Sequence, residues 1–304
     1  MRIHLAGVDT TDFTPTVHRG VVDNCFVSYY YQRKLKNLVA LRPRLGRTIV
    51  DSGAHSFFAS TPSVGSVTAK LKKHRVKDDP ATYMAAYLEW LVANREHYDY
   101  FVELDIGELV GQTTVVGWRA EIVKAGLAGR CIICWHPNAE RLSDFMQAIE
   151  NWPSLYCALE GLRQGRPMMD YVAVVKKCYD RDVRVHGFAM VKQRYMDRVP
   201  FYSVDSASYK ASVMYGALFY QDGSRFGYVR TQRPRTEKGR NALMARLAKA
   251  EAPMDIGYQI RGNAVARDDV LARSVLAMRG MEEHYTALWR ARGIRWQEKF
   301  KEIA

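Results

Sequence analysis

The sequence predicts an α/β fold, a (β/α)8 TIM-type barrel with a basic, mainly helical C-terminal extension. Eight short apolar runs with strand character follow one another up to residue 205, and helical patterns lie between most of them. Eight strands that alternate with helices favour a closed parallel barrel. An open doubly wound sheet with extra elements is the alternative, and it is disfavoured because no Gly-rich dinucleotide fingerprint follows any strand-like run.

The elements can be placed in chain order from these patterns. Each strand-like run is apolar and ends in a polar or Gly-containing cluster, whereas the stretches between them show helical periodicity. The predicted strands are 2–8, 24–30, 48–52, 98–106, 131–136, 155–161, 183–190 and 201–205. The predicted helices are 32–41, 80–96, 113–128, 139–151 and 168–179, and a helix-like run at 210–218 follows the eighth strand.

The chain has 304 residues, of which 48% are hydrophobic and 25% charged, which is ample for a full core in one large domain or two smaller ones. We expect residues 1–220 to form the barrel, with a basic insertion at about 60–79 that is long for a strand-to-helix connection. Residues 221–304 carry 17 Lys and Arg against 10 Asp and Glu. Helical patterns at 239–250 and 268–292 indicate that part of this extension packs on the barrel.

The net charge of +13 indicates a partner that is a polyanion, with nucleic acid as the first expectation. A charge that serves only solubility is the alternative. Two segments carry the densest basic residues. The first is the insertion, which we expect to be a lid or a binding loop. The second is a stretch interleaved with Phe226 and Tyr228, and its mixture of basic and aromatic residues suits phosphate contact and base stacking. Solvated surface is the alternative for both. The candidate nucleic-acid-binding residues are Lys70, Lys72, Lys73, Arg75, Arg225, Arg230, Arg233 and Arg235.

The five cysteines are odd in number and several lie in apolar runs, which favours buried thiols in a reducing compartment over a disulfide framework. No signal-peptide pattern follows Met1, and no apolar run approaches the roughly 20 residues that a membrane span needs. We therefore expect a cytoplasmic, soluble protein with no membrane partner.

Acidic and polar side chains lie at the ends of four of the predicted strands. Carboxylates at the carboxyl ends of different strands of one barrel point into the same mouth, where barrels of this class place their chemistry. For Asp205 alone, capping of the next helix is an equally good interpretation. The candidates, strand by strand, are Asp51, Ser52, Gly53 and His55; Glu103, Asp105 and Gly107; Glu160 and Gly161; and Asp205.

Metal binding is an alternative use of such carboxylates. No tight ligand spacing such as H-x-H appears, so we expect no metal. Cys131 and Cys134 form a C-x-x-C with His136 following, but a zinc site needs a second ligand pair, which we do not find. Positions i and i+3 of a strand also point to opposite faces, so neither zinc nor redox use of this pair is expected.

Three of these segments together resemble the tRNA-guanine transglycosylase superfamily. DSGAHSFF at 51–58 resembles the family's DSGG(F/Y)Q motif, VELD at 102–105 its strand with a base-reading Asp, and SVDS at 203–206 its late strand with the nucleophilic Asp. Their order and wide spacing also match, and the family fold is a (β/α)8 barrel. The compact form is most similar to the phage and bacterial branch that inserts 7-deazaguanines into DNA.

The resemblance implies a glycosyltransferase that exchanges guanine in DNA for a free 7-deazaguanine, such as 7-cyano-7-deazaguanine, without a cofactor. Asp205 would attack C1′ of the nucleoside, and Asp51 would serve as general acid and base. Asp105 would accept hydrogen bonds from the purine. Gly53 and Gly187 would let the backbone approach the ring. The other implied substrate-binding residues are Ser52, His55, Glu160, Gly161, His186 and Phe188.

The chain departs from the family pattern in two ways. The tRNA enzymes carry a zinc site of three Cys and one His after the last barrel strand, and this chain has no Cys beyond Cys178. His55 stands where the family has an aromatic residue that stacks on the base. His55 could stack or donate a hydrogen bond, with a loop histidine as the alternative, and core packing is the alternative for Phe188 and Met190.

Three other functions remain open from the sequence. The first is the same base exchange on tRNA. The second is a nucleic-acid-binding module on a barrel without turnover, against which the presence of both Asp51 and Asp205 argues. The third is a metal-dependent hydrolase, which loss of activity on chelation would support.

Overall fold

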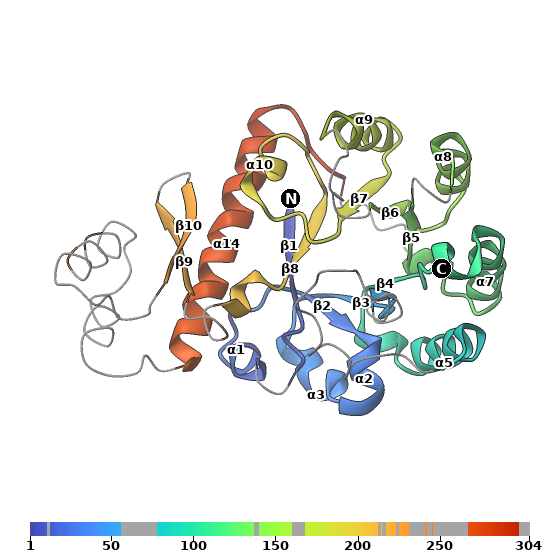
Figure 1. The fold of residues 1–304 in the computed structure, drawn as a ribbon, viewed down its shortest axis with the longest axis horizontal. Coiled ribbons are helices and arrows are strands. Elements are labelled where there is room, and N and C mark those ends of the chain that lie inside the picture. Colours follow the sequence, from blue (N-terminus) through green and yellow to red (C-terminus); the bar gives the residue numbers. More distant parts are fainter. Residues whose placement is uncertain are drawn as a thin grey trace, which may run out of the picture.

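Eight parallel strands close into a barrel in chain order, with β8 pairing with β1 (Figure 1). The structure is a computed structural model that describes residues 1–10, 13–55, 78–136, 140–159, 168–211, 214, 217–222, 225–230, 241, 245 and 267–297. The strands are β1 Arg2–Ala6, β2 Asn24–Ser28, β3 Arg47–Asp51, β4 Tyr100–Val102, β5 Cys131–Trp135, β6 Tyr156–Leu159, β7 Arg184–Gly187 and β8 Ser203–Ser206. All eight predicted strands are present, and the predicted (β/α)8 barrel is confirmed.

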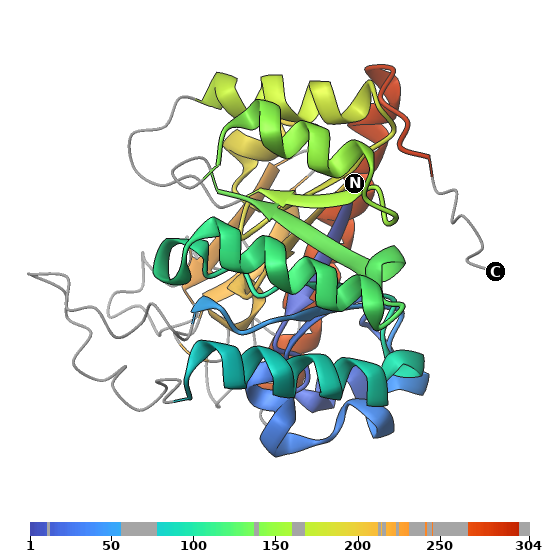
Figure 2. The same ribbon diagram turned by 90° about the vertical axis from the view of Figure 1, so that its right-hand side faces the viewer.

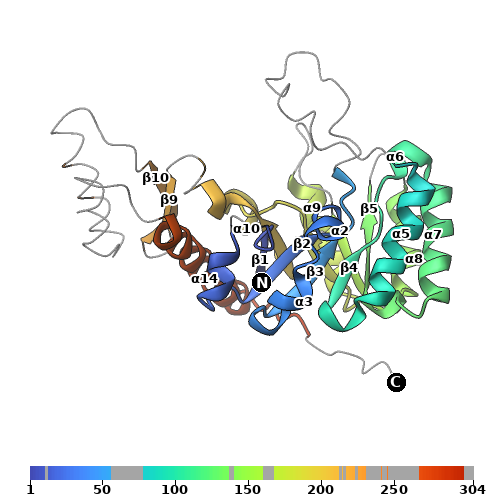
Figure 3. The same cartoon turned by 90° about the horizontal axis from the view of Figure 1, so that it is seen from below.

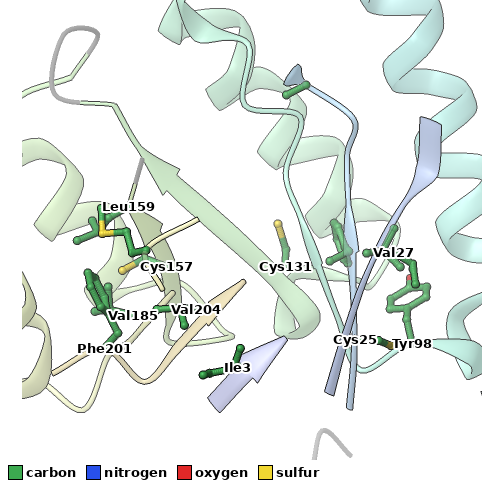
Figure 4. Packing of buried hydrophobic residues seen from close by; sticks show 14 of the residues in the cluster. Ile3, Cys25, Val27, Tyr98, Cys131, Cys157, Leu159, Val185, Phe201 and Val204 are labelled. Atoms are coloured by element: carbon green, nitrogen blue, oxygen red, sulfur yellow. The ribbon is translucent and has the colours of Figure 1, made fainter. Parts of the chain in front are cut away.

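Side chains alternate along each strand between the barrel interior and the layer beneath the helices, because successive residues of a strand face opposite ways. The outward residues form the larger core. Figure 4 shows part of it, in which Cys157, Val185 and Val204 of three neighbouring strands lie near Phe201. The inward residues form a smaller cluster that includes Phe26, Ile49, Tyr100, Val102, Ile132, Cys134, Tyr156, Ala158 and Tyr202.

Helices cover the outside of the barrel, and α5, α7, α8 and α9 lie side by side in Figure 2. Their bounds are α1 Thr14–His18, α2 Tyr29–Leu35, α3 Leu38–Leu41, α5 Pro80–Ala93, α6 Gly107–Val110, α7 Gln112–Lys124, α8 Leu142–Glu150, α9 Met168–Tyr179 and α10 Gln193–Met196. Short 3-10 turns lie at Arg42–Arg44, Arg95–His97, Ala128–Arg130 and Ser208–Lys210. The single helix expected over 32–41 is wrong: Lys36 has a left-handed φ of 51° and ends α2 there.

A long helix, α14 (Arg267–Ala291), packs against the barrel as expected of the extension. The Glu282 carboxylate on α14 accepts hydrogen bonds from the Ile3 backbone N–H at 2.6 Å and from the Asn24 side chain at 3.0 Å. These bonds attach the helix to β1 and β2. None of the helices in the part of the chain described has the length and apolarity needed to cross a bilayer.

The extension also contains a hairpin that the helical prediction missed. Strands β9 (Ala217–Asp222) and β10 (Arg225–Arg230) pair antiparallel on the side of α14 away from the barrel (Figures 1 and 3). The helix-like run at 210–218 is corrected at its C-terminal end, since β9 begins at Ala217. The hairpin crosses the domain boundary expected at residue 220. Phe226 stacks on Tyr285 of α14, with ring centroids 6.2 Å apart, so this aromatic residue of the expected basic surface patch packs on the protein.

All five cysteines are buried thiols, as the composition indicated. The amino-terminal end of the barrel interior is polar. There the guanidinium of Arg184 lies about 5 Å from the ring centroids of Tyr100 and Tyr156 and donates to the Tyr100 hydroxyl at 2.8 Å. The two ends of the barrel interior therefore differ in charge, because the carboxylates lie at the other end.

Candidate functional site

Asp205 is held by β7, not by the segment that follows it. Its Oδ1 accepts hydrogen bonds from the Ala189 backbone N–H at 2.8 Å and from His186 Nε2 at 3.3 Å. The cap residue of the 3-10 turn after β8 is Ala207, and the side chain that accepts from this turn is Ser206, whose Oγ accepts from the Ser208 N–H at 3.0 Å. The capping interpretation of Asp205 is therefore wrong. The Asp205 side chain is 13% exposed, so it lies at the surface of the barrel mouth.

His186 is fully buried and links Asp205 to the barrel interior. Its Nδ1 lies 2.7 Å from Ser203 Oγ, and Ser203 Oγ lies 2.5 Å from the Tyr156 hydroxyl. A His186 ring that carries a proton on Nε2 can satisfy every contact: Tyr156 donates to Ser203, Ser203 donates to Nδ1, and Nε2 donates to Asp205. The ring also stacks on Phe26, with centroids 5.4 Å apart. His186 therefore orients Asp205 and does not face a substrate.

Ala189 adopts a left-handed φ of 54°, in the loop that supplies its N–H to Asp205. This conformation costs a non-glycine residue roughly 1–2 kcal/mol. Strain of this kind persists where the surroundings fix the backbone, and it concentrates at functional sites. The loop after β7 thus holds the second donor to the Asp205 carboxylate in a fixed position.

Asp51 is the last residue of β3 and lies close enough to two other carboxylates to be affected by their charge. Burial, then the negative charge of Asp105 and that of Asp205, raise the pKa of Asp51 to about 7. Hydrogen bonds from Ser28 and from the Gly53 N–H, the latter at 3.2 Å, act in the opposite direction. Three carboxylates from β3, β4 and β8 therefore share the carboxyl-terminal mouth.

Asp105, three residues beyond the end of β4, lies between Ser52 and His136. Ser52 is buried, and its Oγ donates to Asp105 Oδ1 at 3.4 Å. On the other side, Asp105 Oδ2 lies 3.4 Å from His136 Nε2, and the Asp105 side chain is 15% exposed. Ser52 therefore positions Asp105, and a direct contact of Ser52 with substrate is not favoured.

The remaining predicted residues at the mouth fall into two groups. Phe188 is partly buried and contacts the rings of Phe26 and His186 at the top of the interior, and His55 is exposed. The two glycines instead serve packing: a Cβ on Gly187 would lie 2.9 Å from the Phe201 ring, and Gly53 has a φ of 83° with Tyr83 Oη 2.7 Å from its Cβ position.

Several predicted residues lie outside the described part of the chain. They are Glu160, Gly161, Lys70, Lys72, Lys73, Arg75, Arg233 and Arg235. Arg225 and Arg230 are placed only as backbone, as the end residues of β10. Glu103 is structural: it forms a buried bidentate pair with Arg119, at 2.7 and 2.9 Å.

At this end of the barrel, the sequence analysis rejected Cys134 and His136 as ligands and missed Asp9. Cys134 and His136 lie within 4.8 Å of Asp105, measured between side-chain ligand atoms. Asp9 follows β1 and is buried, and its Oδ2 accepts from Gln32 Nε2 at 2.6 Å. The rule applied to four strands, a polar residue after the strand, would also have identified Asp9 in the segment GVDT.

Comparison with protein-family models, with curated proteins and with solved structures finds no match to this chain.

Proposed function

We propose that this protein is a base-exchanging transglycosylase that replaces guanine in DNA with a 7-deazaguanine, such as 7-cyano-7-deazaguanine. The observation that carries the proposal is the convergence of three carboxylates at one barrel mouth, where the charges of Asp105 and Asp205 help to raise the pKa of Asp51 to about 7. Glycosidic chemistry uses such a set: one ionised carboxylate attacks the sugar, and a second carries the proton.

Asp205 is the nucleophile in this proposal. His186 and Ala189 both donate to Oδ1, which leaves Oδ2 to attack C1′ of the target nucleoside. The new bond joins Oδ2 to C1′ as the bond from C1′ to N9 of guanine breaks, and the bonding electrons leave with the base. Burial of His186 and the fixed loop at Ala189 support a nucleophile that is oriented before substrate binds.

Asp51 supplies the proton. A carboxyl with a pKa of about 7 is substantially protonated at neutral pH, so it can protonate the departing guanine. In the second half-reaction its carboxylate takes the N9 proton from the incoming 7-deazaguanine. N9 of that base then attacks C1′ and Asp205 is released. No electrons are gained or lost overall, so the exchange needs no redox cofactor.

The purine would lie between Asp105 and Phe188. Asp105 accepts hydrogen bonds from the exocyclic amine and a ring N–H, and the partly buried Phe188 ring offers an apolar face. To reach C1′ in a duplex the target nucleotide must leave the stack. The charge of +13 supports a polyanionic substrate whose phosphates lie against the basic residues.

An exchange assay tests the proposal. The full-length protein is incubated with labelled guanine and either duplex DNA or tRNA, and the label recovered in polymer is measured. We expect incorporation into DNA, its loss in Asp205→Asn, and near-normal exchange in the control Asp180→Asn, whose exposed carboxylate pairs with Lys176 on α9.

Each other outcome has a defined meaning. Label in tRNA alone would favour the tRNA alternative, and binding of DNA without exchange would favour the non-catalytic module. Exchange at a near-normal rate in Asp205→Asn would remove the nucleophile from the proposal.

A further inference from the structure

We propose that Asp105, Cys134 and His136 form a zinc-binding site on the β4–β5 side of the barrel mouth. One oxygen, one sulfur and one nitrogen of these residues lie within 4.8 Å of one another. This inference goes beyond the proposed function and does not depend on it, because it concerns the ligand set alone.

The topology explains why three residues separated in sequence meet here. Cys134 and His136 are two positions apart at the end of β5, so their side chains face the same way, into the mouth. Asp105 follows β4, which pairs with β5 in parallel through Phe101 with Cys131 and Val102 with Ile132. The end of β4 therefore lies beside the end of β5. The pattern that matters is C-x-H with a carboxylate from the neighbouring strand, and Cys131, on the opposite face, takes no part.

The distances fit a tetrahedral ion. Zinc bonds to nitrogen and oxygen are about 2.0–2.1 Å, which places two such ligands about 3.4 Å apart in a tetrahedron. Asp105 Oδ2 and His136 Nε2 are 3.4 Å apart. A sulfur bonded at about 2.3 Å lies about 3.6 Å from the other ligand atoms. Cys134 Sγ lies within 4.8 Å of both, so it has to come closer by about 1.2 Å at most.

Other residues hold the ligands in place, as partners of metal ligands do in established sites. Ser52 donates to Asp105 Oδ1, which leaves Oδ2 directed at His136. Glu103 Oε1 accepts from the Cys134 backbone N–H at 2.6 Å, and Glu103 is itself fixed by the buried pair with Arg119. These bonds fix the carboxylate and the strand that carries the sulfur.

The donor set and the surrounding charge select the kind of ion. A mixed nitrogen, oxygen and sulfur set suits zinc, whereas magnesium and calcium take oxygen ligands. When the ion binds, Cys134 loses its thiol proton to solvent. The Cys134 side chain is 1% exposed, whereas those of Asp105 and His136 are 15% and 12% exposed. A fourth position therefore opens toward the mouth.

Cobalt substitution tests the site without an activity assay. The full-length protein is made metal-free with a chelator and then titrated with Zn²⁺ or Co²⁺. We expect one equivalent to bind, and the Co²⁺ form to show the near-ultraviolet charge-transfer band of a thiolate ligand. Cys134→Ser should lose that band, and His136→Ala should weaken Co²⁺ binding at least tenfold.

Cys178→Ser is the matched control, because Cys178 is also fully buried but lies on α9. It should keep both the band and the stoichiometry. Circular dichroism checks that each variant is folded, and His136→Ala, at a partly exposed position, tests the site if Cys134→Ser does not fold. No stoichiometric binding to the wild-type protein, or a band that persists in Cys134→Ser, would overturn the inference and leave Asp105 and His136 as an ion pair.

Discussion

The raised pKa of Asp51 links the mouth to the stability of the protein. An unfolded Asp loses its proton near pH 3.8, whereas burial and the neighbouring carboxylates raise the pKa of Asp51 to about 7 in the folded protein. Between these values the folded state keeps a proton that the unfolded state has lost. The free energy of unfolding therefore falls as pH rises from about 4 to about 7, by up to about 4 kcal/mol, and the penalty remains at higher pH.

Asp51→Asn removes this titration. We expect the variant to gain stability relative to wild type as pH rises from 5 to 8, measured by urea unfolding of chelator-treated protein at several pH values. The control Asp180→Asn, on an exposed surface pair, should show no such trend. A difference between Asp51→Asn and wild type that is the same at pH 5 and pH 8 would contradict the raised pKa.

Ser203 tests whether His186 acts through Asp205. Ser203→Ala removes the hydroxyl that fixes the His186 tautomer, so Nε2 no longer donates to Asp205 in every molecule. We expect kcat for guanine exchange to fall roughly tenfold to 100-fold with little change in KM, since the chemistry and not the binding is affected. Nitrogen chemical shifts of the ring report the tautomer directly.

The matched control for Ser203 is Ser154, another buried serine, whose Oγ donates to the Cys131 carbonyl at 2.6 Å away from the mouth. Ser154→Ala should lower stability without a selective loss of kcat. If kcat falls equally in Ser203→Ala and Ser154→Ala, His186 serves packing and does not orient Asp205.

At the scale of elements, one carboxylate of α14 accepts hydrogen bonds from both β1 and β2. Glu282→Ala would leave the buried Ile3 N–H without its acceptor, which costs about 1–3 kcal/mol of unfolding free energy. Glu283, the next residue, is 71% exposed and forms an ion pair with Arg279 at 3.6 Å. Glu283→Ala should change stability by less than about 0.5 kcal/mol. Thermal or urea unfolding compares the two, and equal effects would show that Glu282 is not an anchor.

The sequence correctly predicted the helices and strands whose hydrophobic pattern follows from which of their own residues are buried. The helix over 168–179 is found with the predicted bounds, and every barrel strand was located because each is an apolar run between polar ends. The 32–41 helix failed at Lys36, where the backbone turns left-handed although the side chain carries no such signal. The β9–β10 hairpin was missed because aromatic residues such as Phe226 were assigned to a surface patch and not to a buried strand face.

The sequence predicted a site residue only where the type of that residue and its place at a strand end were enough to identify it. Asp51, Asp105 and Asp205 each lie at or just beyond the carboxyl end of a strand, so the barrel brings them to one end. The bond from Ala189 to Asp205 depends on tertiary geometry that no local pattern contains. The same holds for Cys134 with His136, because their third partner, Asp105, comes from the neighbouring strand and shares no fixed spacing with them.

At the scale of the whole molecule, a net charge of +13 coexists with an acidic mouth. Carboxylates at the mouth would repel a phosphate backbone unless cations elsewhere hold it. In the proposed function, Asp51, Asp105 and Asp205 would act on the base and sugar, while basic residues outside the mouth would bind the phosphates. This arrangement predicts that the affinity for DNA and the exchange rate at saturating DNA respond differently to salt concentration.

Affinity for DNA should fall steeply with salt, because each phosphate contact releases condensed counterions. A protein that contacts 6–10 phosphates loses on the order of 1000-fold or more in affinity between 50 and 200 mM salt. We expect a loss of this size for duplex DNA, measured by fluorescence anisotropy, while exchange at saturating DNA changes little.

Replacing Lys70, Lys72, Lys73 and Arg75 by alanine should flatten the salt dependence. The control Lys176→Ala with Lys177→Ala, on the barrel helix α9, should not. A salt dependence that is flat in the wild-type protein would mean that the positive charge serves solubility. The mouth alone would then have to hold the nucleic acid, although Asp51, Asp105 and Asp205 repel phosphates.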